Sequence, residues 1–271
     1  MPQDLLAGNA IHLRRSTIFQ VAYHPGASPA LVFLHGGLGN RFNWRWQYEF
    51  AIAQGWEALA YDLAGHGQSP PYPRYSIGRH CRDLSRLLDR YSIHAPVLCC
   101  HSYGVPIGLE WAQRNEVCAL VLIAGGTHNL DPWWEVPAMK LLTWGGRHLY
   151  RLPAIQQLTR KLSSSHSHQR LDRFFAESPV PHEEQPYRAL EIFWGYNFFD
   201  RHGNPHFKDV PTLVISGGED STFNAEMGAE LASHFHHSRH LHISTGGHLL
   251  MAELPEQVNN AIAQLVKSIS R

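Results

Sequence analysis

The sequence of 271 residues has little of what marks several common classes of protein. Its 23 basic and 23 acidic side chains cancel, so no excess charge favours binding to nucleic acid or acidic lipid. No apolar run reaches the roughly 18 residues needed to span a bilayer, and the N-terminus lacks the basic and apolar regions of a secretory signal. We therefore expect a globular protein without a membrane span, with the cytoplasm as its default location.

Cysteine is scarce as well. The four cysteines have neither CxxC spacing nor the density of a small disulfide-stapled protein. We predict that all of them are reduced thiols: Cys81, Cys99, Cys100 and Cys118.

Histidine, in contrast, is abundant, with 20 residues. Imidazole is a good ligand for zinc, nickel and copper, so two groups are candidate metal sites: His166 with His168, and the run from His234 to His242. The second run spans the end of a predicted helix and the next strand, which points its rings in several directions. We therefore expect solvated histidines and predict no metal site.

Short, continuously apolar runs recur along the chain, with helical patterns between them. Such runs are typical of strands that are covered on both faces. The expected strands are Ala30–His35, Glu57–Asp62, Ala95–Cys100, Ala119–Ala124, Thr212–Ser216 and His240–Ile243. The expected helices are Arg45–Ala53, Ile77–Tyr91, Tyr103–Arg114, Ala225–His234 and Leu250–Ile269. This alternation predicts a mostly parallel sheet flanked by helices, with antiparallel edge strands over Ile11–Ala22.

The alternation stops between residues 127 and 209, where aromatic residues and prolines are frequent. We predict that this stretch is an inserted helical cap, and that residues 1–126 and 210–271 form the α/β core. A cap over the carboxyl edge of the sheet would wall a ligand site, because ligands of parallel sheets bind at that edge. Packing helices unrelated to any site are the alternative. The aromatic candidates for an apolar pocket wall are Trp133, Trp134, Trp144, Phe193 and Trp194.

The strongest local motif is Cys100-His101-Ser102-Tyr103-Gly104, which follows an apolar strand and opens a helix. A nucleophile elbow requires this context, since the sharp turn lifts the serine hydroxyl above the sheet. Small residues two before and two after the serine relieve crowding in the turn. Gly104 meets this need, whereas Cys100 stands where glycine is usual. Ser102 is therefore the candidate nucleophile, and an ordinary helix start is the alternative.

A nucleophilic serine needs a base within hydrogen-bond reach, and the base needs a carboxylate to orient it. Asp220 and His248 each follow a predicted strand, which places them at the same edge of the sheet as Ser102. The order Ser…Asp…His along the chain is the one expected of this arrangement. We predict a triad of Ser102, His248 and Asp220, with Glu219 and Asp131 as weaker alternatives for the carboxylate.

Acyl transfer also requires hydrogen-bond donors at the position where the oxyanion develops. The loop His35-Gly36-Gly37-Leu38-Gly39 follows a predicted strand, and its glycines let the backbone turn N–H groups inward. We assign the two donors to the amides of Gly37 and Tyr103. The loop matches neither GxGxxG nor a Walker sequence, so no nucleotide site is expected. A second glycine-punctuated loop, Asp62–Ser69, is predicted to be a structural turn.

Together these segments resemble the α/β-hydrolase superfamily from about Ala30 to the C-terminus. The pattern is most similar to the esterase, lipase and C–C hydrolase branch. The resemblance implies an α/β-hydrolase fold with an inserted helical cap, a small-molecule substrate, and no metal or organic cofactor. Epoxide hydrolases and haloalkane dehalogenases of this fold typically carry aspartate at the elbow, whereas this chain has Ser102.

The function expected from these residues is that of a serine hydrolase. It would cleave a carboxylic ester of a small-to-medium apolar or aromatic substrate through an acyl-enzyme. The same triad could instead cleave a C–C bond, hydrolyse a thioester or form a peroxyacid as a perhydrolase. A non-catalytic, hydrolase-like binding protein is a third hypothesis, which the departure at Cys100 permits.

Overall fold

The computed structural model describes residues 5–13, 17–126, 137, 140–141, 144–145, 188–193 and 205–269. These residues form an eight-stranded sheet in the order β1-β2-β4-β3-β5-β6-β7-β8. Its strands are β1 (Asn9–Leu13), β2 (Thr17–His24), β3 (Ala27–Leu34), β4 (Trp56–Tyr61), β5 (Val97–His101), β6 (Ala119–Ile123), β7 (Thr212–Gly217) and β8 (Ser238–Ile243). Strands β3 to β8 pair in parallel, while β2 is antiparallel to both β1 and β4. The predicted, mostly parallel sheet with antiparallel edge strands is therefore confirmed.

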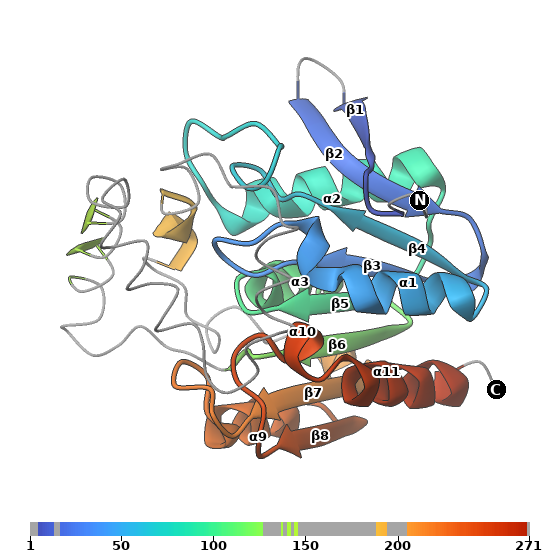
Figure 1. The fold of residues 1–271 in the computed structure, drawn as a ribbon, viewed down its shortest axis with the longest axis vertical. Coiled ribbons are helices and arrows are strands. Elements are labelled where there is room, and N and C mark those ends of the chain that lie inside the picture. The colour runs from blue at the N-terminus through green and yellow to red at the C-terminus, as the bar shows by residue number, and fades with distance from the viewer. Residues whose placement is uncertain are drawn as a thin grey trace.

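Helices cover both faces of this sheet (Figure 1). They are α1 (Arg45–Ala53), α2 (Ile77–Tyr91), α3 (Gly104–Ala112), α9 (Ala225–Ser233), α10 (Leu250–Glu253) and α11 (Pro255–Ile269), with the 3₁₀ turns η1 (Arg41–Trp44), η2 (Leu190–Phe193) and η3 (Pro205–Asp209). Helices α1, α10 and α11 pack with one apolar cluster, and α2, α3 and α9 with the other. Every residue of β5 and β6 is buried between them, which is why these strands read as continuous apolar runs.

Helix α2 shows how the local sequence defines these elements. It begins after Ser76, whose side chain accepts a hydrogen bond from the amide of Arg79 and so caps the first turn. Leu84, Leu87 and Leu88 recur at helical spacing and are buried against the sheet. The helix ends at Ser92, which adopts the left-handed conformation with φ of 56°.

The C-terminal helix departs from the prediction. We expected one helix over Leu250–Ile269, but the chain forms the single turn α10 and then the separate helix α11. Leu254 leaves the helical region, with φ of −132° and ψ of 56°, immediately before Pro255. The physical reason is that proline disfavours a helical conformation in the residue before it and itself suits the first position of a new helix. The other predicted core elements end within three residues of the observed ones.

Most of the predicted cap, residues 127–209, lies outside the described residues. The described parts of it include η2, which Figure 1 places beyond the carboxyl ends of the central strands. Within the described chain, no helix has the length and hydrophobicity required to cross a membrane.

Candidate active site

Ser102 occupies a strained turn between β5 and α3. Its φ is +46°, a left-handed conformation that costs a non-glycine residue about 1–3 kcal/mol and that is frequent at active sites. The turn is held because the Ser102 amide donates to the Ile123 carbonyl at 3.0 Å, and the Val105 amide donates to the Ser102 carbonyl at 2.9 Å. The hydroxyl-bearing residue itself is half-buried. This is the backbone geometry that a nucleophile elbow requires.

The structure explains how the elbow accommodates cysteine at position 100. A Cβ atom placed on Gly108 would lie 2.3 Å from the Cys100 Sγ, so the sulfur occupies space that Gly108 leaves open on α3. On the other side of the turn, a Cβ on Gly104 would lie 2.7 Å from the Leu34 carbonyl oxygen. Both glycines therefore permit a close approach between α3 and the sheet. Cys100 has a side chain where glycine is usual, and Gly108 on the facing helix α3 has none, so the extra volume is accommodated.

Asp220 and His248 lie on adjacent loops after β7 and β8 and are hydrogen-bonded. The His248 Nδ1 lies 2.8 Å from the Asp220 Oδ2. The other carboxylate oxygen of Asp220 accepts hydrogen bonds from the Thr222 amide at 2.8 Å and the Phe223 amide at 3.1 Å. Burial alone would raise the pKa of Asp220, but the hydrogen bond and charge of His248, together with the two amides, lower it below its usual value. Asp220 is therefore an ionised carboxylate that orients the imidazole.

The loop that carries His248 is packed against its neighbours on several sides. The Phe223 ring lies nearly parallel to the His248 ring, with 6.0 Å between their centres. The Gly246 carbonyl accepts a hydrogen bond of 2.9 Å from the Glu219 amide, which joins the two loops. The His101 ring lies 4.9 Å from the His248 ring, so the residue next to Ser102 contacts the residue proposed as its base. The structure thus brings these three loops together at one edge of the sheet.

The glycine loop after β3 lies against the elbow. A Cβ on Gly36 would be 3.4 Å from the Ser102 Cβ, and one on Gly37 would be 3.6 Å from the Tyr103 Cβ. Within the described residues, the amides of Gly37 and Tyr103 donate no hydrogen bond to another backbone group. Two adjacent, unengaged amides beside a serine are the feature expected of an oxyanion hole.

His35 fixes the shape of this loop. Its Nε2 accepts a hydrogen bond of 2.9 Å from the Leu63 amide, so the proton is on Nδ1, which donates to the Gly36 carbonyl at 2.8 Å. Complete burial, the largest cause, lowers the pKa of His35 to about 3. The ring is therefore neutral, and it connects the glycine loop to the turn after β4.

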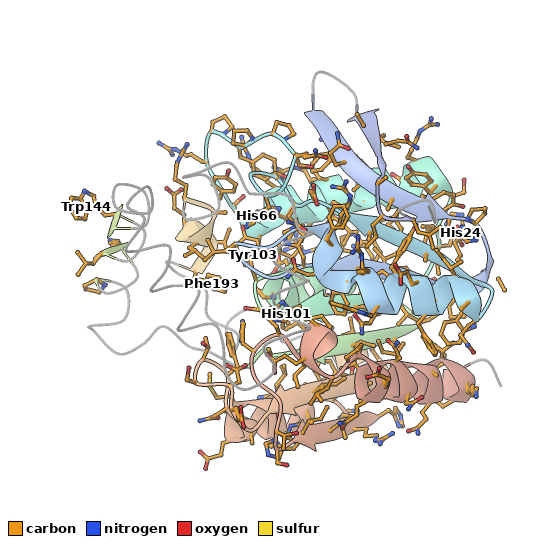
Figure 2. All side chains as sticks on the ribbon, viewed as in Figure 1. His24, His66, His101, Tyr103, Trp144 and Phe193 are labelled. Carbon is orange, nitrogen blue, oxygen red and sulfur yellow. The ribbon has the colours of Figure 1, made fainter. Side chains whose placement is uncertain are left out.

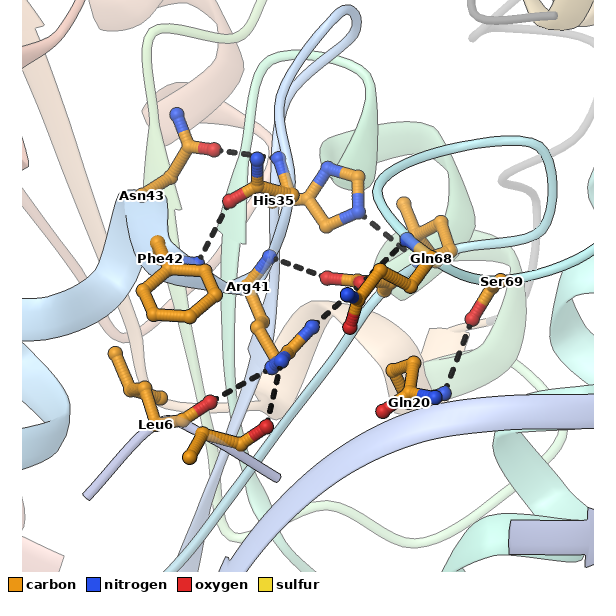
Figure 3. A network of polar contacts seen from close by, with 12 residues as sticks. Leu6, Gln20, His35, Arg41, Phe42, Asn43, Gln68 and Ser69 are labelled. Atoms are coloured by element: carbon orange, nitrogen blue, oxygen red, sulfur yellow. Dashed lines mark hydrogen bonds and ion pairs between the residues drawn. The ribbon is translucent and has the colours of Figure 1, made fainter. Parts of the chain in front are cut away.

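A buried ion pair anchors the turn after β4 (Figure 3). The Arg41 Nη1 lies 2.6 Å from the Asp62 Oδ2, and both side chains are almost fully buried. Asp62 also accepts hydrogen bonds from the amides of Arg41 and Gln68, while the Arg41 guanidinium donates to the carbonyls of Leu6 and Ala7. These contacts join the N-terminal segment to the loops that surround the site. The Asp62–Ser69 loop therefore has the structural role that we predicted.

Tyr103 connects the elbow to the described part of the predicted cap. Its hydroxyl donates to the Ala189 carbonyl at 3.2 Å and accepts a hydrogen bond of 2.9 Å from the His80 Nε2. Its ring meets the Phe193 ring edge-on at 5.8 Å (Figure 2). A Cβ on Gly37 would lie 3.4 Å from the Leu190 side chain. Residues 188–193 therefore lie over the candidate oxyanion hole.

The five aromatic residues predicted to line a pocket do not all lie at the site. Phe193 lies at the site, in contact with Tyr103. Trp144 lies farther out and is 56% exposed (Figure 2). The other three, Trp133, Trp134 and Trp194, are outside the described residues.

The histidine-rich segments show no metal site in the part of the chain that is described, because no three metal-ligating side chains converge there. On β8, His240 bonds to the Ser216 hydroxyl at 2.8 Å, and the His242 ring lies beside it. His166 and His168 are outside the described residues. All four cysteines are free thiols.

Two polar residues near His248 were not anticipated from the sequence. The His101 ring donates a hydrogen bond from Nε2 to the His248 carbonyl at 2.9 Å. The Glu253 carboxylate accepts hydrogen bonds from the amides of Gly247 and Leu249, at 2.6 and 3.1 Å. A carboxylate inside an otherwise apolar helix, two residues before Pro255, is the signal that could have identified Glu253.

The sequence matches the α/β-hydrolase fold family over residues 29–255, and the chain belongs to that family. Solved structures with the same fold include an esterase from Exiguobacterium antarcticum, with a TM-score of 0.77 and 18% identity over 96% of this chain and 99% of that one. A hydrolase from Pseudomonas aeruginosa PA01 has a TM-score of 0.80 and 18% identity, covering 95% of this chain and 97% of the other. The predicted α/β-hydrolase fold is confirmed.

Two curated relatives are similar to part of the chain. Protein ABHD8 from Homo sapiens is 37% identical over 105 residues, which are 37% of this chain and 24% of that protein. Epoxide hydrolase 2 from Siraitia grosvenorii is 38% identical over 101 residues, which are 35% of this chain and 32% of that protein. The aligned segments thus span a third or less of these relatives.

Proposed function

We propose that this α/β-hydrolase is a serine esterase that cleaves carboxylic esters of small-to-medium apolar or aromatic substrates. The observation that carries the proposal is the 2.8 Å hydrogen bond between His248 and Asp220, on loops that contact the strained Ser102 turn. The three residue types needed for acyl transfer therefore belong to one edge of the sheet, beside the glycine loop.

In the proposed mechanism, His248 takes the proton from the Ser102 hydroxyl as the oxygen attacks the ester carbonyl. Asp220 holds the imidazole through Nδ1 and stabilises the imidazolium that forms. The amides of Gly37 and Tyr103 bind the oxyanion of the tetrahedral intermediate, and each donor of this kind is typically worth 10²–10³ in rate. His248 then protonates the leaving alcohol and activates the water that hydrolyses the acyl-enzyme.

The apolar part of the substrate is expected to lie between the glycine loop and residues 188–193. Leu38, on that loop, is 43% exposed, and Leu190 and Phe193 are half-buried beside Gly37 and Tyr103. Apolar side chains next to a few convergent polar groups are typical of small-molecule sites. An acyl or aryl group fits this lining better than a charged one does.

The test is a Ser102→Ala variant assayed on a series of p-nitrophenyl esters of increasing acyl length. We expect turnover to fall by at least 10³-fold, and a fluorophosphonate probe to label the wild type at Ser102. Ser233→Ala, at an exposed position on α9, is the matched control and should keep full activity. Unchanged turnover in Ser102→Ala would refute the proposal.

The same preparation separates the alternative reactions. Thioesters, dienoic diketones and a peroxyacid-forming assay would be compared with simple esters by kcat/KM. A preference for one of these by orders of magnitude would retain the triad and replace the ester as substrate. Absence of labelling in a folded sample would favour a non-catalytic binding protein.

A further inference from the structure

The peptide backbone on both sides of His248 is bound by one buried carboxylate. Glu253, 6% exposed, accepts from the amide of Gly247 at 2.6 Å and from that of Leu249 at 3.1 Å. The residues before and after the proposed base are therefore attached to the same side chain. The two carboxylate oxygens are both hydrogen-bond acceptors, so each of them suits one backbone N–H donor.

The carbonyl of His248 is bound from the opposite direction. The His101 Nε2 donates to it at 2.9 Å, which leaves Nδ1 as an unprotonated acceptor. That Nδ1 faces the glycine loop, since a Cβ on Gly36 would lie only 2.4 Å from it. His101 is fully buried and directly precedes Ser102. One ring therefore contacts the base loop, the oxyanion loop and the elbow together.

The local sequence explains how Glu253 reaches this position. It is the last residue of α10, which consists of a single turn, and only Leu254 separates it from Pro255, the first residue of α11. The short turn is itself anchored, because the Gln47 side chain donates to the Met251 carbonyl at 3.1 Å. The Glu253 side chain can thus fold back along the turn to the loop that precedes it.

We propose that Glu253 and His101 are positioning residues that hold the backbone of His248 so that its ring faces Ser102. This inference rests on the proposed function. Asp220 fixes one nitrogen of the imidazole, but the ring is carried by the loop between β8 and α10, and the loop sets where Nε2 lies. Glu253 restrains the amides of that loop, and His101 restrains the carbonyl between them.

The test begins with Glu253→Gln, which replaces one acceptor oxygen by an NH₂ group that cannot accept from a backbone amide. We expect kcat to fall about 10- to 100-fold with KM changed less than about twofold, because displacing a catalytic group by about 1 Å costs on this order. Glu256→Gln, at an exposed position three residues later, is the matched control and should behave as wild type.

A purely structural role, as a cap on α10, makes a different prediction. It would lower stability but leave both kcat and the low-field proton resonance of the His248 Nδ1–H···Asp220 hydrogen bond unchanged. We expect Glu253→Gln to shift or broaden that resonance. A folded variant with an unchanged resonance, whatever its stability, would overturn the proposal.

A second pair of variants decides the question if Glu253→Gln does not fold. His101→Phe removes the donor and should lower kcat, whereas His101→Gln keeps a nitrogen donor and should recover part of it. Equal activity in both variants would overturn the role of His101. If the wild type hydrolyses no ester, the proposed function fails, and the resonance of His248 still tests the positioning independently.

Discussion

Acid is expected to begin destabilising this protein at pH values above those at which ordinary carboxylates titrate. Four histidines are fully buried around the elbow, and burial, the largest cause in each, lowers their pKa to about 3: His35, His66, His80 and His101. In the unfolded chain the pKa of each of these imidazoles returns to about 6.5. Between these two values the unfolded state binds more protons than the folded state, so the stabilising effect is complete above pH 6.5 and is lost as the pH falls toward 3.

The magnitude follows from proton linkage. Each buried histidine contributes a slope of about 1.4 kcal/mol per pH unit, so four contribute roughly 5 kcal/mol per unit near pH 5. Integrated from neutral pH, the free energy of unfolding falls by roughly 8 kcal/mol by pH 5. Because a domain of ordinary stability has about 5–15 kcal/mol, half of the molecules should be unfolded between about pH 4 and 5.5. The lowered pKa of Asp220 acts in the same direction at still lower pH.

Urea unfolding followed by circular dichroism at several pH values between 7.5 and 4.5 measures this slope. His66→Gln should reduce it by about one proton, or about 1.4 kcal/mol per pH unit. His94→Gln, at an exposed position, is the matched control and should leave it unchanged. A slope below about 1.5 kcal/mol per pH unit, or a folded protein at pH 3.5, would refute the assignment of four neutral buried histidines.

Two further predictions concern the elbow and the turn after β4. Gly108→Ala should destabilise the protein by about 1–3 kcal/mol, because its Cβ would meet the Cys100 sulfur at 2.3 Å. Adding Cys100→Gly to Gly108→Ala should restore part of the lost stability, as measured by thermal melts. An equal loss of stability with and without Cys100→Gly would contradict the explanation. Asp62→Asn leaves the Arg41 charge buried and uncompensated, which should cost about 3–5 kcal/mol in urea unfolding. His236→Ala removes an exposed contact with Asp209 and should cost less than about 1 kcal/mol. A similar loss in both variants would argue against the buried ion pair.

The fold could be predicted from the sequence because its signals are local. Continuous apolar runs mark strands that are covered on both faces, and their alternation with helical patterns leaves few possible topologies. The positions of Ser102, Asp220 and His248 after three such runs place them at one edge for the same reason. The one misjudged element, Leu250–Ile269, contained its own warning in Pro255, whose effect on the preceding residue outweighed the apolar periodicity.

What could not be predicted depends on contacts between distant parts of the chain. The space beside Cys100 exists because Gly108 faces it, and helical periodicity does not specify which glycine faces which strand. Similarly, Glu253 has the appearance of a solvated helix residue until α10 is seen to turn it toward the loop of His248. Side chains that act by restraining a neighbouring backbone have no spacing signature, so the groups that they bind are recognised only in three dimensions.

The hydroxyl of Tyr103 has a consequence for how a substrate enters. One oxygen is shared between His80, in the core, and the carbonyl of Ala189, in the segment above the site. A substrate that pushes this segment outward must stretch or break the hydrogen bond between the Tyr103 hydroxyl and the Ala189 carbonyl. It then displaces Tyr103, the residue whose amide we assign to the oxyanion hole. If the Tyr103 amide binds the oxyanion as we propose, substrate entry and oxyanion binding are therefore linked. A substrate that enters without displacing residues 188–193 would then find the Tyr103 amide in place. A bulky substrate that displaces them would lose both rate and affinity.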